Sequence, residues 1–507
     1  MSENHVTRKQ LLIVAFVSGA AIMTIEIAAA RLLAPYFGTS LLIWTNIIGV
    51  VLLALSAGYF FGGRIADRRP HVRLLFTLLV AAGAAGIAIP WVVRPIARFV
   101  TLDALLLQSG SFFIFIASFA VTLLLLAVPL CLLGMISPFI IKLYSIDQHR
   151  VGESSGTVFA VSTVGSIIGT FLPALFLIPT FGTNATITSA GVALLAVGCW
   201  GTLHSTATRT AALLLTLIAS SFAGSAGIRA TSATLYEGES LYHYIRVEQG
   251  TDGSRRLIFN EGLGFQSEFH PDRILTGNYF DYYSTLPIFF NSGRKLNVLI
   301  LGLAGGTISR QLSHFYGDRL HIDGVEIDKK VIDIGYRFFD LGQKNLSVFN
   351  EDGTVYLMRS VKKYDIVIVD AYHEELYIPW TMTTLEFWRL VSEKLSPDGI
   401  VAMNVIGNPD TKLVRAITNT QASVFQSVFT AGAGENNLNT TVVSGNRVFF
   451  SDDLKYDTAP EELWPLIRYL TSTAESVLPD PGGPVLTNDK APVEFMTDSL
   501  MLGQDGA

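Results

Sequence analysis

The strongest constraint on this chain is a series of apolar runs, each about 20 residues long, that recur up to about residue 227. A helix of that length crosses the hydrocarbon core of a bilayer, and a soluble fold has no use for so many in succession. Beyond Tyr236 charged residues become frequent and no such run recurs. The sequence therefore predicts an all-α polytopic membrane domain, with the lipid bilayer as its partner, followed by a domain exposed to water.

We expect about seven transmembrane helices, at residues 11–33, 41–61, 74–93, 112–141, 157–178, 185–203 and 211–228. The long run at 112–141 contains Pro129 and Pro138, so the number of crossings there is open. The first run is too long for a cleaved signal peptide, contains Glu26 and Arg31, and leads directly into further spans. We therefore expect it to remain in the mature protein.

The second half alternates strand-like and helix-like segments, which predicts a Rossmann-like α/β fold with a parallel sheet covered on both faces. The expected strands are 296–301, 320–326, 347–350, 366–369 and 400–405, with helices at 308–315, 331–339 and 383–395. Segments 242–247 and 256–260 predict a small β unit ahead of this sheet, and segments 440–443 and 447–451 a hairpin near its end. The expected domains are 1–230 (membrane helices), 231–295 (β subdomain) and 296–507 (Rossmann-like).

Two kinds of partner are disfavoured by composition. The formal net charge is −6 and no long basic stripe occurs, which argues against nucleic acid. Cys131 and Cys199 fall in apolar spans without a Cys/His cluster, so we expect small buried side chains and no metal site.

Glycines and carboxylates follow the predicted parallel strands where each strand ends. The turn GLAGG (Gly302, Ala304, Gly305, Gly306) follows the first strand, Glu326 and Asp328 the second, Asp352 and Gly353 the third, and Asp370 the fourth. Each alone could be a tight turn, a helix cap or a solvated strand end. Because carboxyl ends of parallel strands share one edge, together they predict an adenosine-binding cleft.

The same motifs, in this order, resemble those of the spermidine synthases, or polyamine aminopropyltransferases, and the whole chain resembles their membrane-fused members. The matching segments are ESLYHYIRV (239–247), NEGLGFQ (260–266), VLILGLAGGT (298–307), VEID, EDG and VIVDAYHEELYIP (367–379). The resemblance implies that Gln266 lies near the sulfonium, Glu326 holds the ribose, Asp352 the adenine and Asp370 the attacking amine, with Tyr372 beside the cofactor. It also implies a homodimer.

Departures from the family pattern bear on the substrate. Ala304 stands where the family has an acid for the amino end of decarboxylated S-adenosylmethionine, and Phe280 replaces a polar residue between Tyr279 and Asp281. Tyr372 and His373 fall in the family's Asp-Ser-Ser-Asp segment, so its second acid is lost. Since a diamine needs a carboxylate at each end, we expect weak polyamine binding unless Glu374 or Glu375 compensates. Ala304 leaves room for the carboxylate of intact S-adenosylmethionine.

The main hypothesis is therefore cleavage of the S–Cγ bond of S-adenosylmethionine, giving 5'-methylthioadenosine and homoserine lactone. In it Asp370 stabilises the sulfonium, and Tyr279 and Gln266 shape the pocket for the amino-acid arm. The alternatives are aminopropyl transfer from decarboxylated S-adenosylmethionine to a polyamine, methyl transfer to a lipid-soluble acceptor, and a transporter that senses S-adenosylmethionine.

Sidedness follows from two opposed arguments. Lys and Arg residues favour a cytoplasmic N-terminus, and seven spans would then place the second half outside. S-adenosylmethionine, however, is made in the cytoplasm. We give the location of this substrate precedence over the number of spans, and expect a cytoplasmic enzyme domain on a bacterial-type inner membrane. The tail VLTNDKAPVEF (485–495) resembles the ending of the membrane-fused relatives, and we expect it to dock the C-terminus onto the core.

Overall fold

The computed structural model describes residues 6–38, 41–101, 111–145, 151–202, 228–229, 231–260, 262, 264–291, 293–372, 376–432, 439–448 and 459–501. The chain divides into two compact units. The first comprises residues 1–231 with 237–244, and the second comprises 232–236 with 245–507.

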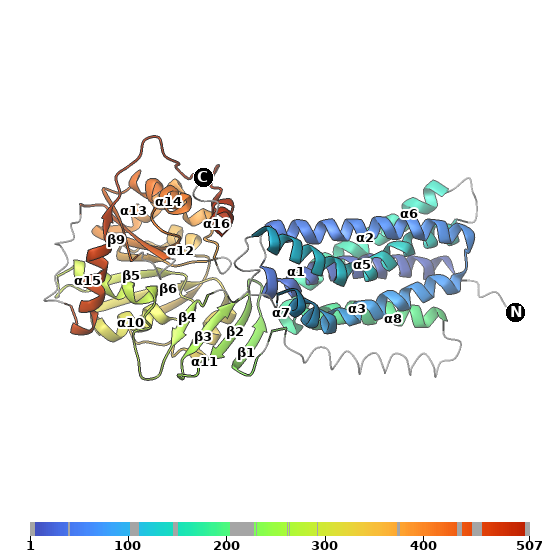
Figure 1. Ribbon diagram of the computed structural model, residues 1–507, viewed down its shortest axis with the longest axis horizontal. Coiled ribbons are helices and arrows are strands. Elements are labelled where there is room, and N and C mark those ends of the chain that lie inside the picture. The colour runs from blue at the N-terminus through green and yellow to red at the C-terminus, as the bar shows by residue number, and fades with distance from the viewer. Residues whose placement is uncertain are drawn as a thin grey trace. The chain divides into compact units, whose positions relative to one another are not determined.

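The first unit is a bundle of long helices (Figure 1). They are α1 (Arg8–Phe37), α2 (Leu41–Arg68), α3 (Val72–Thr101), α5 (Ser111–Tyr144), α6 (Val151–Leu172, continued by η2, Pro173–Leu177, and α7, Ile178–Phe181) and α8 (Thr183–Thr202). Among the described residues, six helices are long and apolar enough to cross a membrane. The seventh expected span, 211–228, lies outside the described residues except for its last position. The doubtful run with Pro129 and Pro138 is one continuous helix, α5.

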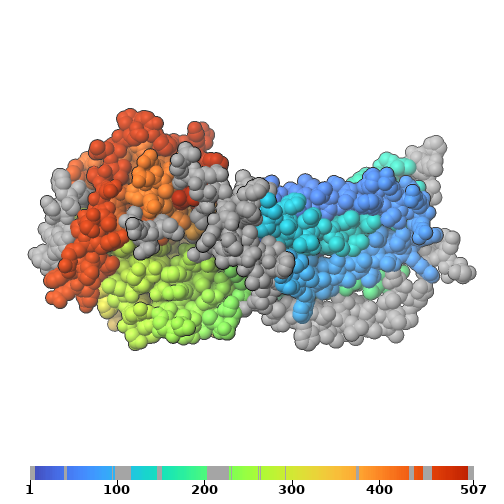
Figure 2. Space-filling model, in the orientation of Figure 1, coloured from blue at the N-terminus to red at the C-terminus, as the bar shows by residue number. Residues whose placement is uncertain are grey.

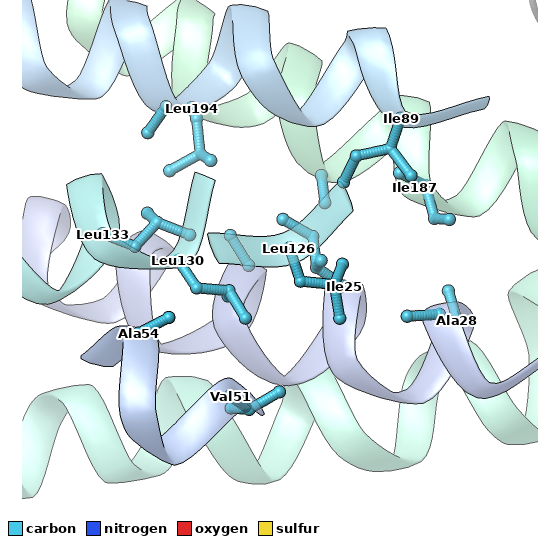
Figure 3. Packing of buried hydrophobic residues seen from close by; sticks show 14 of the residues in the cluster. Ile25, Ala28, Val51, Ala54, Ile89, Leu126, Leu130, Leu133, Ile187 and Leu194 are labelled. Carbon is cyan, nitrogen blue, oxygen red and sulfur yellow. The ribbon is translucent and has the colours of Figure 1, made fainter. Parts of the chain in front are cut away.

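Small residues let the helices of this unit pack with their backbones nearly touching. A Cβ added to Gly165 of α6 would lie 2.1 Å from the carbonyl oxygen of Phe16 in α1, and one added to Gly134 of α5 would lie 2.8 Å from that of Leu55 in α2. Figure 3 shows apolar side chains between the helices, among them Ile25, Ala28, Val51, Ala54, Ile89, Leu126, Leu130, Leu133, Ile187 and Leu194. The centre of the bundle is therefore apolar.

The second unit is built on an eight-stranded sheet in the order β12-β10-β11-β9-β8-β5-β6-β7. Its parallel part consists of β5 (Leu296–Leu301), β6 (Leu320–Glu326), β7 (Leu346–Asn350), β8 (Tyr364–Val369) and β9 (Leu395–Ile406). The antiparallel part consists of β10 (Ser427–Ala431), β11 (Asn439–Gly445) and β12 (Glu475–Ser476). The chain runs outward from β5 to β7 and then returns to β8 on the other side of β5. The boundary between β5 and β8 is thus the topological switch point, where open α/β sheets bind ligands.

Both faces of the central parallel strands β5 and β8 are largely buried, as their continuous apolar sequences predict. In β5, Val298 and Ile300 face the cluster formed with α10 (Thr307–Tyr316) and the 3-10 helix η3 (Tyr279–Phe289). Leu299 and Leu301 face the opposite cluster, formed with α12, α13 and α14 (Gly353–Arg359, Leu385–Lys394 and Lys412–Ala422). The predicted fold class, apolar helices followed by an α/β domain, is confirmed.

A separate four-stranded sheet, β1-β2-β3-β4, precedes the large one. Its strands are β1 (Thr234–Glu239), β2 (Tyr244–Gln249), β3 (Arg255–Phe259) and β4 (Ser267–Phe269). β2, β3 and α11 (Lys329–Phe338) share an apolar cluster that contains Ile245, Leu257 and Val331. The predicted β unit is therefore present, with two strands more than expected.

The expected hairpin near the C-terminus is wrong. β11 pairs with β10 and β9 rather than with residues after it, and Arg447 and Val448 are not in a strand, while residues 449–451 lie outside the described residues. The α15 and α16 helices (Trp464–Thr473 and Val493–Met501) follow, and Figure 2 shows these C-terminal segments, in red, on the surface of the unit.

Candidate active site

The glycine turn after β5 lies directly against the end of β8. Gly302 has a φ of +91°, and a Cβ there would lie 2.4 Å from the carbonyl oxygen of Asp370. Gly306, with a φ of +93°, is the N-cap of α10. The N–H groups of Gly302 and Leu303 both donate to the carbonyl of Val325 at 3.0 Å. The glycines therefore serve the close approach of three strand ends.

Glu326 ends β6 and reaches back to this turn. Its Oε2 accepts a hydrogen bond from the N–H of Ala304 (2.9 Å) and its Oε1 one from the N–H of Asp328 (3.0 Å). Burial raises the pKa of Glu326 to about 7, although both N–H donors act in the opposite direction. Ala304 has a φ of +48°, a left-handed conformation that alanine adopts at some cost. The turn and the acid thus form one rigid edge.

Two further acids of this edge cap helices. Asp328 accepts from the N–H of Lys330 at the start of α11, and Asp352 from the N–H of Val355 at the start of α12, both at 2.9 Å. Gly353, the first residue of α12, is buried. Asp352 is therefore the N-cap of α12. It lies at the strand edge where the sequence predicts a ligand.

Asp370 follows β8 and pairs with Tyr279, which begins η3. The Tyr279 hydroxyl donates to Oδ2 of Asp370 at 3.2 Å. Burial raises the pKa of Asp370 to about 7, while the side chains of Tyr279 and Asn404 act in the opposite direction. Asp370 as a whole is partly accessible, but its Oδ1 atom is buried. A carboxyl with this pKa changes its protonation near neutral pH.

Asp281 fixes the start of η3 and so the position of Tyr279. It is 1% exposed, and its carboxylate accepts from the N–H groups of Thr276 and Gly277 and from Nε2 of Gln311, the last at 2.6 Å. Gln311 belongs to α10, which starts at the glycine turn. This buried acid therefore ties the helix that follows the turn to the helix that carries Tyr279.

Two residues of this cluster, Tyr283 and Asn404, are not predicted by the sequence motifs. Tyr283 lies one helical turn after Tyr279, with ring centroids 6.4 Å apart, and is 1% exposed. Asn404 is 2% exposed and follows Met403, which pairs with Val369, the residue before Asp370. A polar residue inside the apolar run VAMNVI is the one sequence signal that could have pointed to it.

Tyr372 is a third tyrosine near Asp370, after Tyr279 and Tyr283. Its hydroxyl donates to the carbonyl oxygen of Asn404 at 3.1 Å. Burial raises the pKa values of Tyr279, Tyr283 and Tyr372 well above their ordinary value, so all three stay neutral at physiological pH. Three neutral tyrosines therefore surround the carboxyl of Asp370. His373, Glu374 and Glu375 lie outside the described residues.

Gln266 lies in the segment between β3 and β4 and is half-buried. Its N–H donates to the carbonyl of Leu257. Its neighbours contact both parts of the site, because Ser267 Oγ accepts from the N–H of Gly305 (2.8 Å) and the ring of Phe265 lies 6.0 Å from that of Phe280. The segment predicted to lie near the sulfonium is thus beside the glycine turn and η3.

The C-terminal tail packs on the same domain. The N–H of Leu385 donates to the carbonyl of Leu486, and Thr384 Oγ1 donates to Oδ1 of Asn488 at 2.8 Å. Beyond the tail, Asp498 of α16 accepts from the hydroxyl of Tyr377, which follows the Asp370 segment. These contacts agree with a docking role for the tail.

The sheet order, the switch point between β5 and β8, and the acids along its carboxyl edge define an α/β domain of the nucleotide-binding type. A spermine/spermidine synthase domain matches residues 279–431, which contain Tyr279, the glycine turn, all four strand-end acids and Asn404.

Curated proteins with similar sequences are polyamine aminopropyltransferases. The chain is 32% identical over 280 residues to a probable polyamine aminopropyl transferase of Bifidobacterium longum, covering 52% of this chain and 61% of that protein. It is 24% identical over 418 residues to polyamine aminopropyltransferase 1 of Streptomyces coelicolor, covering 77% of this chain and 74% of that protein. The latter share exceeds what the second unit alone can supply, so the similarity extends into the helical unit. Together these similarities support a spermidine synthase-like family.

Coverage of the relatives is partial. The chain spans about three-fifths of the length of the Bifidobacterium protein and of a polyamine aminopropyltransferase from Hydrogenobaculum, to which it is 30% identical over 177 residues. Among solved structures, a probable spermidine synthase from Corynebacterium glutamicum aligns with a TM-score of 0.42 at 18% identity, covering 51% of this chain and 97% of that chain.

Proposed function

We propose that this protein is an aminopropyltransferase-type enzyme that binds an adenosylsulfonium substrate over the edge of the parallel sheet and releases 5'-methylthioadenosine. In this proposal decarboxylated S-adenosylmethionine donates its aminopropyl group to an amine. The observation that carries the proposal is the hydrogen-bonded pair of Asp370 and Tyr279 at the switch point, with the raised pKa of Asp370. The names of the relatives support the same reaction.

The reaction is a displacement at carbon. The nitrogen lone pair of the amine forms a bond to the carbon beside sulfur, and the electrons of the S–C bond return to sulfur, which becomes a neutral thioether. The amine must lose a proton, and Asp370, with a pKa of about 7, is suited to accept it. In this arrangement Glu326 binds the ribose, Asp352 the adenine amino group, and Gln266 and Tyr372 lie along the arm of the substrate.

A second candidate is cleavage of intact S-adenosylmethionine. Ala304 favours it, because the absence of an acid at that position removes a repulsion against the methionine carboxylate. That carboxylate would attack its own Cγ and close a homoserine lactone, again with loss of the thioether as 5'-methylthioadenosine. Intramolecular attack benefits from a large effective concentration, and no proton has to be removed.

One experiment separates these reactions. The purified full chain is incubated with decarboxylated S-adenosylmethionine and putrescine, or with S-adenosylmethionine alone, and the products are identified by mass spectrometry. Methylthioadenosine with spermidine in the first mixture supports aminopropyl transfer, and methylthioadenosine with homoserine lactone in the second supports cleavage. S-adenosylhomocysteine would indicate methyl transfer instead. Binding of both compounds without any of these products would refute an enzymatic role and favour a sensor.

We also propose that the first unit is integral to the membrane. Its helices have the required length, and large apolar side chains are exposed on their outer surfaces, among them Leu52, Leu124 and Leu175, which are 59 to 69% exposed. A cytoplasmic location of the second unit would give it access to the substrate. A C-terminal fusion reporter that is active only in the cytoplasm tests this, and an inactive reporter on an expressed protein would contradict it.

A further inference from the structure

Three buried oxygen atoms around Asp370 have no hydrogen-bond partner among the described residues. They are Oδ1 of Asp370, the hydroxyl of Tyr283 and Oδ1 of Asn404. Tyr283 is 1% exposed and Asn404 2%, so neither side chain reaches bulk solvent. A buried polar group without a partner is costly, and three together indicate a ligand that supplies what they lack.

The three atoms come from three elements that meet at one place. Asp370 ends β8 and Asn404 lies in β9, one residue beyond the paired positions Val369 and Met403. Tyr283 lies in η3, on the turn after Tyr279, which hydrogen-bonds to Asp370. Burial and the Asp370 carboxylate raise the pKa of the Tyr283 phenol and the Asn404 backbone lowers it, so Tyr283 lies near both residues. The three oxygens therefore belong to side chains that lie close together.

The chemistry of the three oxygens restricts the ligand. Carboxylate and amide oxygens only accept hydrogen bonds, and a phenol can accept one. A sulfonium has no N–H group and would leave all three without a donor. A primary ammonium has three N–H donors and a positive charge that an ionised Asp370 attracts.

We propose that Tyr283 is a specificity-determining residue, whose hydroxyl joins Asp370 Oδ1 and Asn404 Oδ1 in accepting the three N–H donors of one primary ammonium group. This inference rests on the proposed function, because the ammonium belongs either to the acceptor amine or to the aminopropyl arm of the sulfonium substrate. The pocket selects against N-methylated amines, which cannot satisfy all three acceptors.

The test compares Tyr283→Phe with wild type by calorimetry and thermal unfolding. Removing an unpartnered hydroxyl should leave the melting temperature of the ligand-free protein unchanged or higher, while affinity for putrescine, titrated into protein saturated with methylthioadenosine, falls about tenfold or more. Affinity for a trimethylated analogue, which has no N–H at that end, should be the same for both proteins.

Tyr316→Phe is the matched control. The Tyr316 hydroxyl donates to the carbonyl of Ser284 at 2.7 Å, so its removal should lower the melting temperature and leave amine affinity unchanged. Asn404→Leu provides a second variant of nearly equal volume, with the same selective loss expected. An equal loss for the trimethylated analogue would overturn the assignment, and so would unchanged affinity of folded Tyr283→Phe and Asn404→Leu for both putrescine and decarboxylated S-adenosylmethionine.

A second arm identifies the source of the ammonium. Decarboxylated S-adenosylmethionine is titrated into both proteins without any amine. A loss confined to the putrescine titration assigns the ammonium to the acceptor, and a loss in this second titration assigns it to the aminopropyl arm. Loss in neither titration overturns the inference. These are binding measurements, so failure to detect turnover would count against the proposed function and not against the ammonium site.

Discussion

Replacing Asp370 by asparagine should stabilise the ligand-free protein at alkaline pH. Burial raises the pKa of Asp370 from 3.8 to about 7, so the folded protein binds this proton more tightly than the unfolded chain does. The resulting stability is present in full below about pH 4 and is lost as pH rises through about 7. A difference of about 3 in pKa corresponds to about 4 kcal/mol, the greatest gain expected for Asp370→Asn at pH 8.

The assay is thermal and denaturant unfolding of ligand-free protein in detergent, at intervals from pH 5 to pH 8. Wild-type stability should fall across this range, and Asp370→Asn should show a shallower fall, the remainder of which belongs to Glu326. Asp318→Asn removes an exposed carboxylate and should follow the wild type. Asp370 would not be the source of this pH dependence if Asp370→Asn lost stability with pH as steeply as wild type, or if it were less stable than wild type at pH 8.

Three further changes have defined outcomes. Ala304→Asp should shift preference from S-adenosylmethionine toward its decarboxylated form, measured as a ratio of dissociation constants; an unchanged ratio would show that this position does not face the carboxylate. Gly302→Ala should destabilise the second unit by about 2 kcal/mol or more, because its Cβ would meet the Asp370 carbonyl at a φ of +91°; denaturation midpoints give the result, and a neutral effect would contradict the contact. Asp281→Asn should lower the free energy of unfolding by about 2 to 4 kcal/mol, because the amide NH₂ would face the Gly277 N–H and the Gln311 amide, which are themselves donors. If Tyr279 moves as a result, kcat should fall by a larger factor than KM changes. Loss of stability with unchanged kinetics would limit Asp281 to a structural role.

The parts of the site that could be predicted from sequence are those tied to strand ends. Gly302, Glu326, Asp352 and Asp370 follow continuous apolar strands, and parallel pairing brings the ends of such strands to one edge whatever the details of packing. The fold of the second unit is predictable for the same reason, because period and composition determine strands that are buried on both faces.

What sequence could not show depends on side chains that meet only through tertiary packing. Tyr283 is one of 17 tyrosines, and its position beside Asp370 follows from how η3 is anchored by Asp281 and Gln311. The sequence predicts the wrong partner for β11, because Ser444 and Gly445 are typical turn residues, whereas in the structure they continue the strand against β9 and β10. Backbone pairing with the two neighbouring strands outweighs the local turn preference of these residues.

The stability cost and the chemistry of the site have the same origin. Burial raises the pKa of Asp370 to about 7, so near neutral pH part of the ligand-free protein has this carboxyl protonated, and Asp370 Oδ1, the Tyr283 hydroxyl and Asn404 Oδ1 have no hydrogen-bond partner among the described residues. A bound ammonium would favour the ionised carboxylate and satisfy all three oxygens, so binding near pH 7 should release protons from Asp370 or the amine. The affinity for a primary amine should therefore rise as pH increases from 6 to 8, opposite to the stability of the ligand-free protein. Calorimetry in buffers of different ionisation enthalpy measures the released protons, and proton uptake on binding would contradict this coupling.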